Sequence, residues 1–344
     1  MMVFSTRHIS GIVLLACLAA CSRQEHFVEQ RLQMHTMVEI QVLALARDAQ
    51  SVRRSMDAAF AAMAKVENEL SWFEKENDLA RIRRAAAGQV VPVAPLVLES
   101  LQLARRLNQL SGGMYDVCAG PIIRAWGFGP GKTNSVPSER EIADALARSG
   151  MDKLVILADR QTVSTVVAGV DVDLSSLAAG CAVDKAAEAL LAGGCSNFLI
   201  NGGGEIRTAS SGRKTWRIGI QVPAENAAFD AFFPDRIIKL KNGCVSTSGS
   251  YRNFYQAGSN TYAHIVNPAT GRPAKTDTIS VTTWAETCTR ADAWSTALFA
   301  LPAARALALA DQLPEVECLI VESPAPGSKK FRFHYSKEFA HRTQ

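Results

Sequence analysis

The sequence lacks several patterns that would place it in a common class of protein. Although eight cysteines occur among its 344 residues, none has the Cys-X-X-Cys spacing of a zinc or redox site. There is no Gly-X-Gly-X-X-Gly run and no P-loop lysine motif, so a Rossmann or Walker nucleotide site is unsupported. The 37 Lys and Arg residues form no dense run and the net charge is only +4, which argues against a nucleic-acid partner.

Beyond residue 20 the sequence also lacks an apolar run of membrane-spanning length, a short-period repeat and a low-complexity block. The composition, 48% hydrophobic and 20% charged, is that of a globular protein and not of a disordered one. A length of 344 residues allows one large domain or two ordinary ones.

The first twenty residues have the organisation of an export signal. Arg7 supplies a positive charge, residues 9–18 are apolar but too few to span a bilayer comfortably, and Leu-Ala-Ala-Cys follows at 18–21. Small residues before a cysteine resemble the lipobox of bacterial lipoproteins, in which the cysteine, here Cys21, is lipidated and becomes the new N-terminus. The alternative is an ordinary secretory signal that happens to contain a cysteine.

We therefore expect residues 1–20 to be a lipoprotein signal peptide, 21–33 a tether and 34–344 the folded domain. A lipid anchor holds a domain at a membrane without spanning it, and we expect this domain to face the periplasm. Ser22, in place of aspartate, resembles lipoproteins that are sorted to the outer membrane, which favours the outer over the inner membrane.

Six cysteines follow residue 21, and several of them lie in apolar runs such as 117–119 and 317–320. The periplasm permits disulfides. Because no paired spacing singles out a site, buried free thiols are the simplest interpretation.

Apolar periodicity predicts helices and strands that interleave without a regular βαβ rhythm. Apolar residues recur at helical spacing across 52–70, and Ser138 with Glu141 forms a capping box for a further helix. This irregular order favours an α+β fold over a doubly wound parallel sheet. The predicted helices are 52–70, 96–110, 138–148, 182–191 and 291–299, and the predicted strands are 36–45, 154–157, 162–173, 198–200, 216–222, 236–240, 279–284, 317–321 and 331–335.

Three segments combine glycine with residue types that bind cofactors. Gly112-Gly113-Met114-Tyr115-Asp116, followed by Trp-Gly-Phe-Gly at 126–129, would by itself be interpreted as a structural turn. In 171–184, small residues let backbone groups approach a ligand, and Asp173 either accepts hydrogen bonds from a ribose or flavin or caps a helix start. The hydroxyl-rich segment 246–251 suits phosphate or carbonyl oxygens, with a plain turn as the alternative.

Two later segments carry a histidine and a carboxylate. His264 lies in 262–273, beside a turn with proline and glycine, and is either structural or catalytic. Asp292, Ser295 and Thr296 fall at i, i+3 and i+4, which is one helix face. A carboxylate and two hydroxyls offer hard oxygen ligands to Mg²⁺, whereas the alternative is an exposed helix start at which Asp292 is favourable anyway.

In this order and spacing, the segments resemble the FAD:protein FMN transferase (ApbE) family. The resemblance runs from about residue 34 to 299 and includes Gly-Met-Tyr-Asp at 113–116, Asn-Gly-Gly-Gly-Glu-Ile at 201–206 and Thr-Ser-Gly at 247–249. It implies a two-part α+β fold, with mixed sheets flanked by helices and a central cleft for FAD and metal. It also implies that FAD is cut at its pyrophosphate, that FMN passes to a Ser or Thr hydroxyl of an acceptor flavoprotein, and that AMP is released.

Position by position, the resemblance implies a site. His264 lies where the family has a histidine near the reacting phosphate, and it would take the proton of the acceptor hydroxyl. Mg²⁺ would neutralise the pyrophosphate and orient the leaving AMP. The implied FAD contacts are Met34, Phe73, Met114, Tyr115, Asp116, Asp173 and Ala179. The implied metal ligands are the backbone carbonyl of Ser176 and the side chains of Asp292, Ser295 and Thr296.

The chain departs from the family pattern beside this site. Many members carry Lys where this chain has Ala179, and Asp is usual at the position of Asn267. These departures favour an alternative in which the chain binds or delivers FAD without transferring FMN, and a further alternative is hydrolysis of FAD to FMN and AMP. The expected acceptor belongs to a membrane or periplasmic redox system.

Replacement of the lipobox cysteine tests the expected anchor. In Cys21→Ser no thiol is available for lipidation, so we expect a soluble or uncleaved species in place of a membrane-bound one. Membrane fractionation and metabolic lipid labelling measure this directly, and unchanged labelling in the variant would disprove the anchor.

Overall fold

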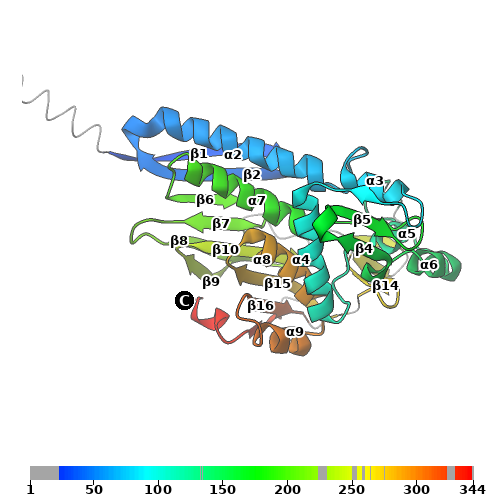
Figure 1. Cartoon of the computed structure of the whole chain (residues 1–344). Helices are drawn as coiled ribbons and strands as arrows, with labels where there is room; N and C mark the ends of the chain where they lie inside the picture. The colour runs from blue at the N-terminus through cyan, green and yellow to red at the C-terminus, as the bar shows by residue number, and fades with distance from the viewer. Residues whose placement is uncertain are drawn as a thin grey trace, which may run out of the picture.

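The structure, a computed structural model, describes residues 23–131, 133, 135–223, 231–249, 254–257, 260–263, 265–274, 276–323 and 330–342. The expected signal peptide, Cys21 and His264 lie outside these residues. Figure 1 shows helices laid along one face of a large sheet, with a smaller lobe that contains β4, β5, α5 and α6 at one end. None of the helices in the described part is long and apolar enough to cross a membrane.

Within the described residues, eight strands form the large sheet, and every pairing in it is antiparallel. Strand β2 shows why these segments form strands, because Val38, Ile40 and Val42 alternate with polar residues and bury their side chains on one face. In the order in which they pair, the strands are β1 (Gln24–Gln33), β2 (Thr36–Leu45), β6 (Phe198–Asn201), β7 (Ile206–Ala209), β10 (Gly243–Gly249), β15 (Thr278–Ala285), β16 (Glu317–Glu322) and β17 (Arg332–Tyr335).

Helices cover one face of this sheet and build the main core. Helix α2 packs along α7, α7 packs along α8, and α8 lies on β10 and β15 (Figure 1). Apolar residues at helical spacing face inward, as Met56, Phe60 and Met63 do on α2. The helices in this layer are α2 (Ala49–Leu70), α4 (Pro95–Ser111), α7 (Ser175–Ala192), α8 (Cys288–Phe299) and α9 (Ala303–Ala310).

A smaller lobe and several hairpins complete the described fold. The hairpin β8–β9 covers the opposite face of the large sheet, where Ile218 and Ile238 pack with Val245 of β10 and Leu319 of β16. The lobe contains α3 (Asp78–Arg84), α5 (Gly120–Ala125), α6 (Glu139–Leu146) and the three-stranded sheet of β3 (Val91–Pro92), β5 (Thr162–Thr165) and β4 (Leu154–Leu157). The hairpins are β8 (Trp216–Gln221) with β9 (Phe232–Leu240), β11 (Phe254–Ala257) with β12 (Asn260–Ala263), and β13 (Val266–Asn267) with β14 (Arg272–Pro273). Short 3₁₀ turns are η1 (Ala46–Asp48), η2 (Met151–Lys153), η3 (Ala158–Arg160) and η4 (Phe339–His341).

The predicted α+β class is confirmed, and the expected mixed sheets are antiparallel wherever strands pair in the described residues. The predicted strands 36–45 and 154–157 coincide with β2 and β4. The capping box is present, because Ser138 accepts a hydrogen bond from the backbone N–H of Glu141 while the Glu141 side chain accepts one from Ser138.

Four expectations need correction. The hydroxyl-rich segment expected as a loop or turn at 246–251 belongs, up to Gly249, to the central strand β10, because its backbone pairs with β15. Residues 24–33 form the edge strand β1 instead of belonging to a tether; their polar composition hid a strand in which only Phe27 is buried. The strand expected at 162–173 ends at Thr165, because Gly169 adopts a φ of +78° and turns the chain. The helix expected at 182–191 begins at Ser175, so the small residues before 182 are helical.

Gly180 explains why small residues begin α7. A Cβ atom at this position would lie 2.3 Å from the carbonyl oxygen of Cys288, so the backbones of α7 and α8 meet here without a side chain between them. The contact also brings the Gly180 N–H within 3.0 Å of the Asp292 carboxylate.

We expect Gly180→Ala to lower the free energy of unfolding by about 1–3 kcal/mol, because the added methyl group must push the two helices apart. This loss exceeds the helix-propensity gain of about 1 kcal/mol that alanine brings over glycine. Thermal or urea denaturation measures the difference. Gly212→Ala is the matched control, since nothing lies within 4 Å of its added Cβ, and equal stabilities of the two variants would contradict the prediction.

Candidate functional site

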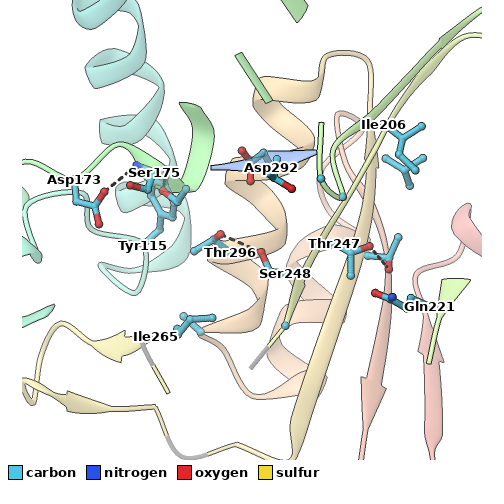
Figure 2. Close-up of a pocket in the computed structure, with 18 of the residues that line it drawn as sticks. Tyr115, Asp173, Ser175, Ile206, Gln221, Thr247, Ser248, Ile265, Asp292 and Thr296 are labelled. Carbon is cyan, nitrogen blue, oxygen red and sulfur yellow. Dashed lines mark hydrogen bonds between the residues drawn. The ribbon is translucent and has the colours of Figure 1, made fainter. Parts of the chain in front are cut away.

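A cavity of about 1,000 Å³ lies where the start of α7, the turn after α4, strand β10 and helix α8 meet (Figure 2). It brings together residues that are more than 200 positions apart in the sequence, from Phe73 to Thr296. The predicted site residues that line it are Phe73, Met114, Tyr115, Asp116, Asp173, Ser176, Asp292 and Thr296.

The other predicted residues lie outside this lining. Met34 occupies the turn between β1 and β2 with a φ of +51°, and its neighbours Thr36 and Met37 line the cavity instead. Ala179 is half-buried on α7, and the Ser295 side chain is fully buried behind the cavity wall. The predicted general base, His264, lies outside the described residues, although Ile265 directly after it lines the cavity (Figure 2).

The Gly-Met-Tyr-Asp turn is held by hydrogen bonds at both of its last two residues. Gly112 ends α4 with a φ of +66°, which favours glycine. The Tyr115 hydroxyl lies 2.8 Å from the Ser176 hydroxyl, and burial raises its pKa well above the ordinary value, so it stays protonated.

Asp116 supports the turn with both carboxylate oxygens. They accept the backbone N–H groups of Cys118 at 2.8 Å and Met151 at 2.9 Å. Burial raises the pKa of Asp116, and these two hydrogen bonds oppose the rise. The residue therefore fixes the backbone beside the cavity as well as lining it.

Asp173 and the first turn of α7 form one wall of the cavity. One oxygen of Asp173 accepts the Ser175 N–H at 2.9 Å (Figure 2). The N-cap position itself is Leu174, so Asp173 supports the helix start from one residue before the expected cap. Burial raises the pKa of Asp173. Ser175 and Ser176 line the cavity as the first residues of an 18-residue helix, whose positive dipole end favours an anionic ligand.

A chain of hydroxyl groups forms the opposite wall, and its hydrogen-bond directions can be assigned. The Ser295 hydroxyl donates to the carbonyl oxygen of Asp292 at 2.8 Å, because a carbonyl only accepts. Ser295 must therefore accept from Ser248 at 2.6 Å, and Ser248 in turn accepts from Thr296 at 3.1 Å. This direction leaves the lone pairs of the Thr296 oxygen available to a ligand in the cavity.

Asp292 is the carboxylate that could hold a cation. Its side chain is buried and accepts the Gly180 N–H at 3.0 Å, and among the described residues no Lys, Arg or His forms an ion pair with it. Burial and the nearby negative charge of Glu205 raise its pKa well above the ordinary range. A buried carboxylate beside a second carboxylate, with the Thr296 oxygen one helical turn away, fits a divalent cation.

A second buried carboxylate, Asp171, positions the cavity wall without lining it. It accepts the Trp72 indole N–H at 2.9 Å and forms ion pairs with Arg83 and Arg124. The Arg124 guanidinium lies 4.6 Å from the Trp72 ring centroid, and a Cβ at Gly129 would meet that ring. The last position of the Trp-Gly-Phe-Gly run therefore requires glycine, because a side chain there would clash with the Trp72 ring.

The first residue of the same run holds the loop around β13 and β14. The Trp126 indole donates to the carbonyl oxygen of Gly271 at 2.7 Å, and its ring lies 5.1 Å from that of Tyr262. Within the loop, the Asn267 side chain accepts the Ala269 N–H at 2.9 Å. Asn267 therefore supplies the side-chain oxygen that an aspartate would supply to this turn.

Two functional contributors were missed at the level of sequence. Ser248 lies in the Thr-Ser-Gly segment, but only the fold places its hydroxyl between those of Ser295 and Thr296. Glu205 ends the Asn-Gly-Gly-Gly-Glu segment and lies near Asp292 in the fold. The spacing of residues along the chain could not indicate this, because 87 positions separate the two carboxylates.

The fold that carries this cavity is similar to the folds of solved ApbE proteins. The structure matches Flavin Transferase ApbE from Vibrio cholerae with a TM-score of 0.80 and 29% identity, covering 93% of this chain and all of that one. It matches the ApbE protein of Thermotoga maritima with a TM-score of 0.80 and 26% identity, again over 93% of this chain and all of the other.

Sequence relatives agree with this likeness. The chain is 31% identical to the FAD:protein FMN transferase of Vibrio cholerae over 80% of its own length and 82% of the relative. It is 30% identical to the FAD:protein FMN transferase of Haemophilus influenzae over 88% and 90% of the two lengths. The sequence model of the ApbE family matches residues 34–320. The chain belongs to the ApbE family.

Glu205 predicts a pH dependence of stability in metal-free protein. Burial raises its pKa from an ordinary 4.5 to about 7, so the folded state holds the proton more tightly than the unfolded state does. The contribution of Glu205 to the free energy of unfolding is therefore fully present below about pH 4.5 and is lost as pH rises through about 7. Glu205→Gln should therefore stabilise the protein at pH 8, relative to its effect at pH 4.5, by on the order of 2–3 kcal/mol.

Thermal or urea denaturation of both proteins at the two pH values, in the presence of a chelator, measures this difference. Glu25→Gln is the control because Glu25 is exposed on β1. Parallel pH curves for the wild type and Glu205→Gln would contradict the assignment.

Proposed function

We propose that this chain is an FAD:protein FMN transferase, which uses Mg²⁺ to transfer the FMN moiety of FAD to a Ser or Thr hydroxyl of an acceptor flavoprotein with release of AMP. The observation that carries the proposal is the convergence of the α7 start with Asp292 and Thr296 of α8 in one cavity. Membership in the family and relatives named as FAD:protein FMN transferases support the same reaction.

Some residues of the cavity would bind FAD, and others hold the binding groups in position. The positive dipole end of α7 suits the pyrophosphate of FAD, and Asp173 can accept hydrogen bonds from the flavin or ribose. The paired hydroxyls of Tyr115 and Ser176 fix that turn against α7, so the groups around the phosphates stay in place.

Asp292, Thr296 and the Ser176 carbonyl would hold the metal. When bound, Mg²⁺ supplies positive charge that stabilises the reacting pyrophosphate and the leaving AMP. The acceptor hydroxyl attacks the phosphorus atom of the FMN half, and its proton passes to a base, which we assign to His264 from the family pattern. Ser248 keeps the Thr296 proton directed away from the cavity, because it accepts that hydrogen bond.

The two departures from the family pattern are compatible with this function to different degrees. Asn267 keeps the turn at β13 by accepting the Ala269 N–H, so the turn does not need an aspartate. Ala179 cannot supply the positive charge that Lys gives in many members. We expect weaker FAD binding as a result, by about 1–3 kcal/mol.

We also propose that the chain is lipid-anchored at Cys21 and faces the periplasm, on the basis of the lipobox-like segment. Strand β1 begins at Gln24, only three residues after Cys21. Thr36 and Met37, after the far end of β1, line the cavity. The ten residues of β1, at about 3.3 Å each, would place the cavity roughly 30 Å from the anchored end of the domain.

The proposed reaction is tested with purified protein, FAD, MgCl₂ and a library of synthetic peptides that contain Ser or Thr. Mass spectrometry detects an FMN-peptide adduct, and chromatography detects AMP. An adduct with matching AMP is the expected result. AMP and free FMN without an adduct would show hydrolysis of FAD, and FAD binding without AMP would show a flavin-binding protein; either result would overturn the proposal.

Asp292→Asn tests the metal site with little change in shape. The amide oxygen can still accept the Gly180 N–H, but the negative charge is lost, so we expect Mg²⁺-dependent AMP release to fall by more than about 100-fold. Thr296→Val should have a milder effect, because water can replace a neutral hydroxyl ligand. AMP release measured against Mg²⁺ concentration checks both variants.

Asp235→Asn is the control, because Asp235 lies outside the cavity on β9. Wild-type turnover and an unchanged Mg²⁺ response in Asp292→Asn would place the metal elsewhere.

A further inference from the structure

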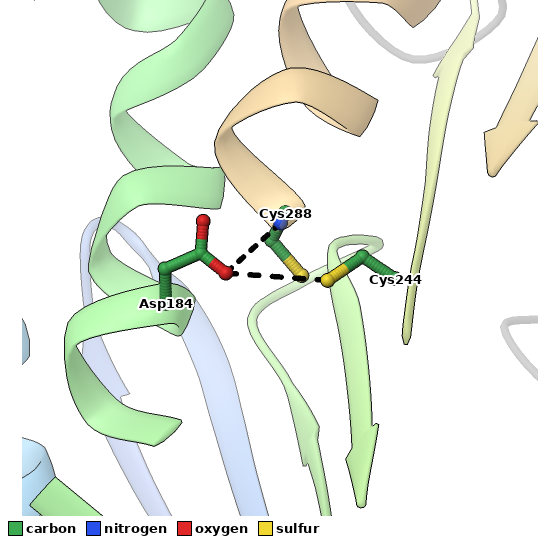
Figure 3. Close-up of side chains that lie close together, drawn as sticks. All are labelled: Asp184, Cys244 and Cys288. Atoms are coloured by element: carbon green, nitrogen blue, oxygen red, sulfur yellow. Dashed lines mark hydrogen bonds between the residues drawn. The ribbon is translucent and has the colours of Figure 1, made fainter. Parts of the chain in front are cut away.

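Two cysteine thiols lie side by side outside the cavity, beneath the start of α8. Cys244 on β10 and Cys288 at the first position of α8 are both fully buried (Figure 3). Their sulfur atoms and one carboxylate oxygen of Asp184 all lie within 4.8 Å of one another. The other cysteines of the described residues, Cys118, Cys181, Cys195 and Cys318, are also buried, but their sulfur atoms do not belong to this three-residue cluster.

The fold brings these two thiols together through a short connection. Cys244 pairs with Ala285 in the β10–β15 ladder, and only Glu286 and Thr287 separate Ala285 from Cys288. Helix α8 then lies back over β10, and Gly180 of α7 fixes the backbone of Cys288 from the other side. The two cysteines are therefore held on neighbouring, tightly packed elements.

We propose that Cys244 and Cys288 form a disulfide when the protein meets a thiol–disulfide oxidant. The two sulfur atoms already lie within 4.8 Å of each other. Closing the bond therefore needs the two side chains to rotate toward each other.

The surroundings of the pair favour thiol exchange over metal binding. The Asp184 carboxylate already accepts from Arg207 at 3.0 Å and from the N–H groups of Cys288 and Thr289, both at 2.9 Å, so it caps α8. The Arg207 guanidinium also lies 3.3 Å from the Cys244 sulfur. A cation between these ligands would face the fixed positive charge of Arg207, which disfavours metal binding.

The exchange conserves atoms and electrons. The thiolate of one cysteine attacks a disulfide sulfur of the oxidant, which forms a mixed disulfide and releases one thiol of the oxidant. The second cysteine, as its thiolate, attacks the sulfur of the first and releases the other thiol. The two cysteines lose two protons and two electrons, and the oxidant is reduced to two thiols. Burial raises the pKa of Cys288, so we expect exchange during folding or after local opening of α8.

The disulfide would lie close to the proposed active site along both of the elements that it joins. Asp292 follows Cys288 by four residues, one helical turn, and Ser248 follows Cys244 by four residues along β10. A disulfide therefore ties together the two elements whose hydroxyl chain orients Thr296. This consequence rests on the proposed function, whereas formation of the bond does not.

The full chain, refolded with oxidised glutathione or with dithiothreitol, tests the bond. Thiols are blocked with iodoacetamide under denaturing conditions, and the peptides are mapped by mass spectrometry. We expect a peptide joined through Cys244 and Cys288 only in the oxidised sample. Free alkylated thiols at both positions, or a different pairing, would overturn the proposal whether or not the protein transfers FMN.

Variants and a metal probe separate the remaining explanations. Cys118→Ser, a buried thiol next to Met151, is the matched control and should keep the bond, whereas Cys244→Ser and Cys288→Ser should each abolish it. Stoichiometric zinc in protein purified without chelator, with both thiols protected from alkylation until it is removed, would also overturn the proposal.

Oxidation should have a measurable effect on folded protein. We expect the oxidised wild type to melt roughly 5 °C above the reduced form, because the bond constrains the unfolded chain. The Cys244→Ser/Cys288→Ser variant should melt at the same temperature under both conditions. If the joined peptide forms but the wild-type melting temperature falls on oxidation, the bond is strained and its proposed supporting role at α8 is wrong.

Discussion

The close contact between α7 and α8 is the constraint on which the candidate site depends. At Gly180 the two helix backbones meet without an intervening side chain, and the Gly180 N–H reaches the carboxylate of Asp292. Because α7 also presents Ser175 and Ser176 at its first turn, the same contact sets the distance between the wall formed by the α7 start and the wall that carries Asp292. Asp184, one turn further along α7, caps the start of α8 and fixes the relative position of the helices a second time.

Electrostatics then determine what the cavity can hold. Asp292 is buried beside the negative charge of Glu205, and burial raises the pKa of both carboxylates. Two carboxylates held close together in a buried place cost stability when both are charged, and the proposed cation would remove that cost. The chain of hydroxyl groups from Thr296 to the Asp292 carbonyl also fixes the direction of each hydrogen bond, because each hydroxyl has only one proton to donate. The oxygen of Thr296 therefore faces the cavity as an acceptor.

The smaller lobe contributes rigidity more than chemistry. Asp171 holds Trp72, Arg83 and Arg124 together, and Trp126 holds the loop around β13 through the Gly271 carbonyl. These contacts give Trp126 and Gly129 a packing role, and Phe128 and Gly129 also line the cavity. The segment that contains the predicted base is therefore flanked by residues whose positions are fixed by packing.

The sequence by itself determined the α+β class, most helices and strands, and the set of residue types that a flavin and metal site needs. Local periodicity and capping carry that information, as the Ser138 capping box and strand β2 illustrate. It missed β1, because an edge strand buries little and its composition is polar. It also missed the short strand β7 and the hydroxyl-rich strand β10, whose composition is typical of a turn. It also misjudged 162–173, because Val170 and Val172 are apolar but are buried in a loop after the turn at Gly169.

Only the tertiary structure decided how the site residues are arranged. It placed Ser295 behind the cavity wall, Glu205 beside Asp292, and Ser248 between two hydroxyls of α8. It also placed Cys244 beside Cys288, although 43 residues lie between them. Spacing along the chain reports neighbours on one helix or strand, whereas these contacts arise where separate elements pack, and their geometry depends on every side chain in the layer between them.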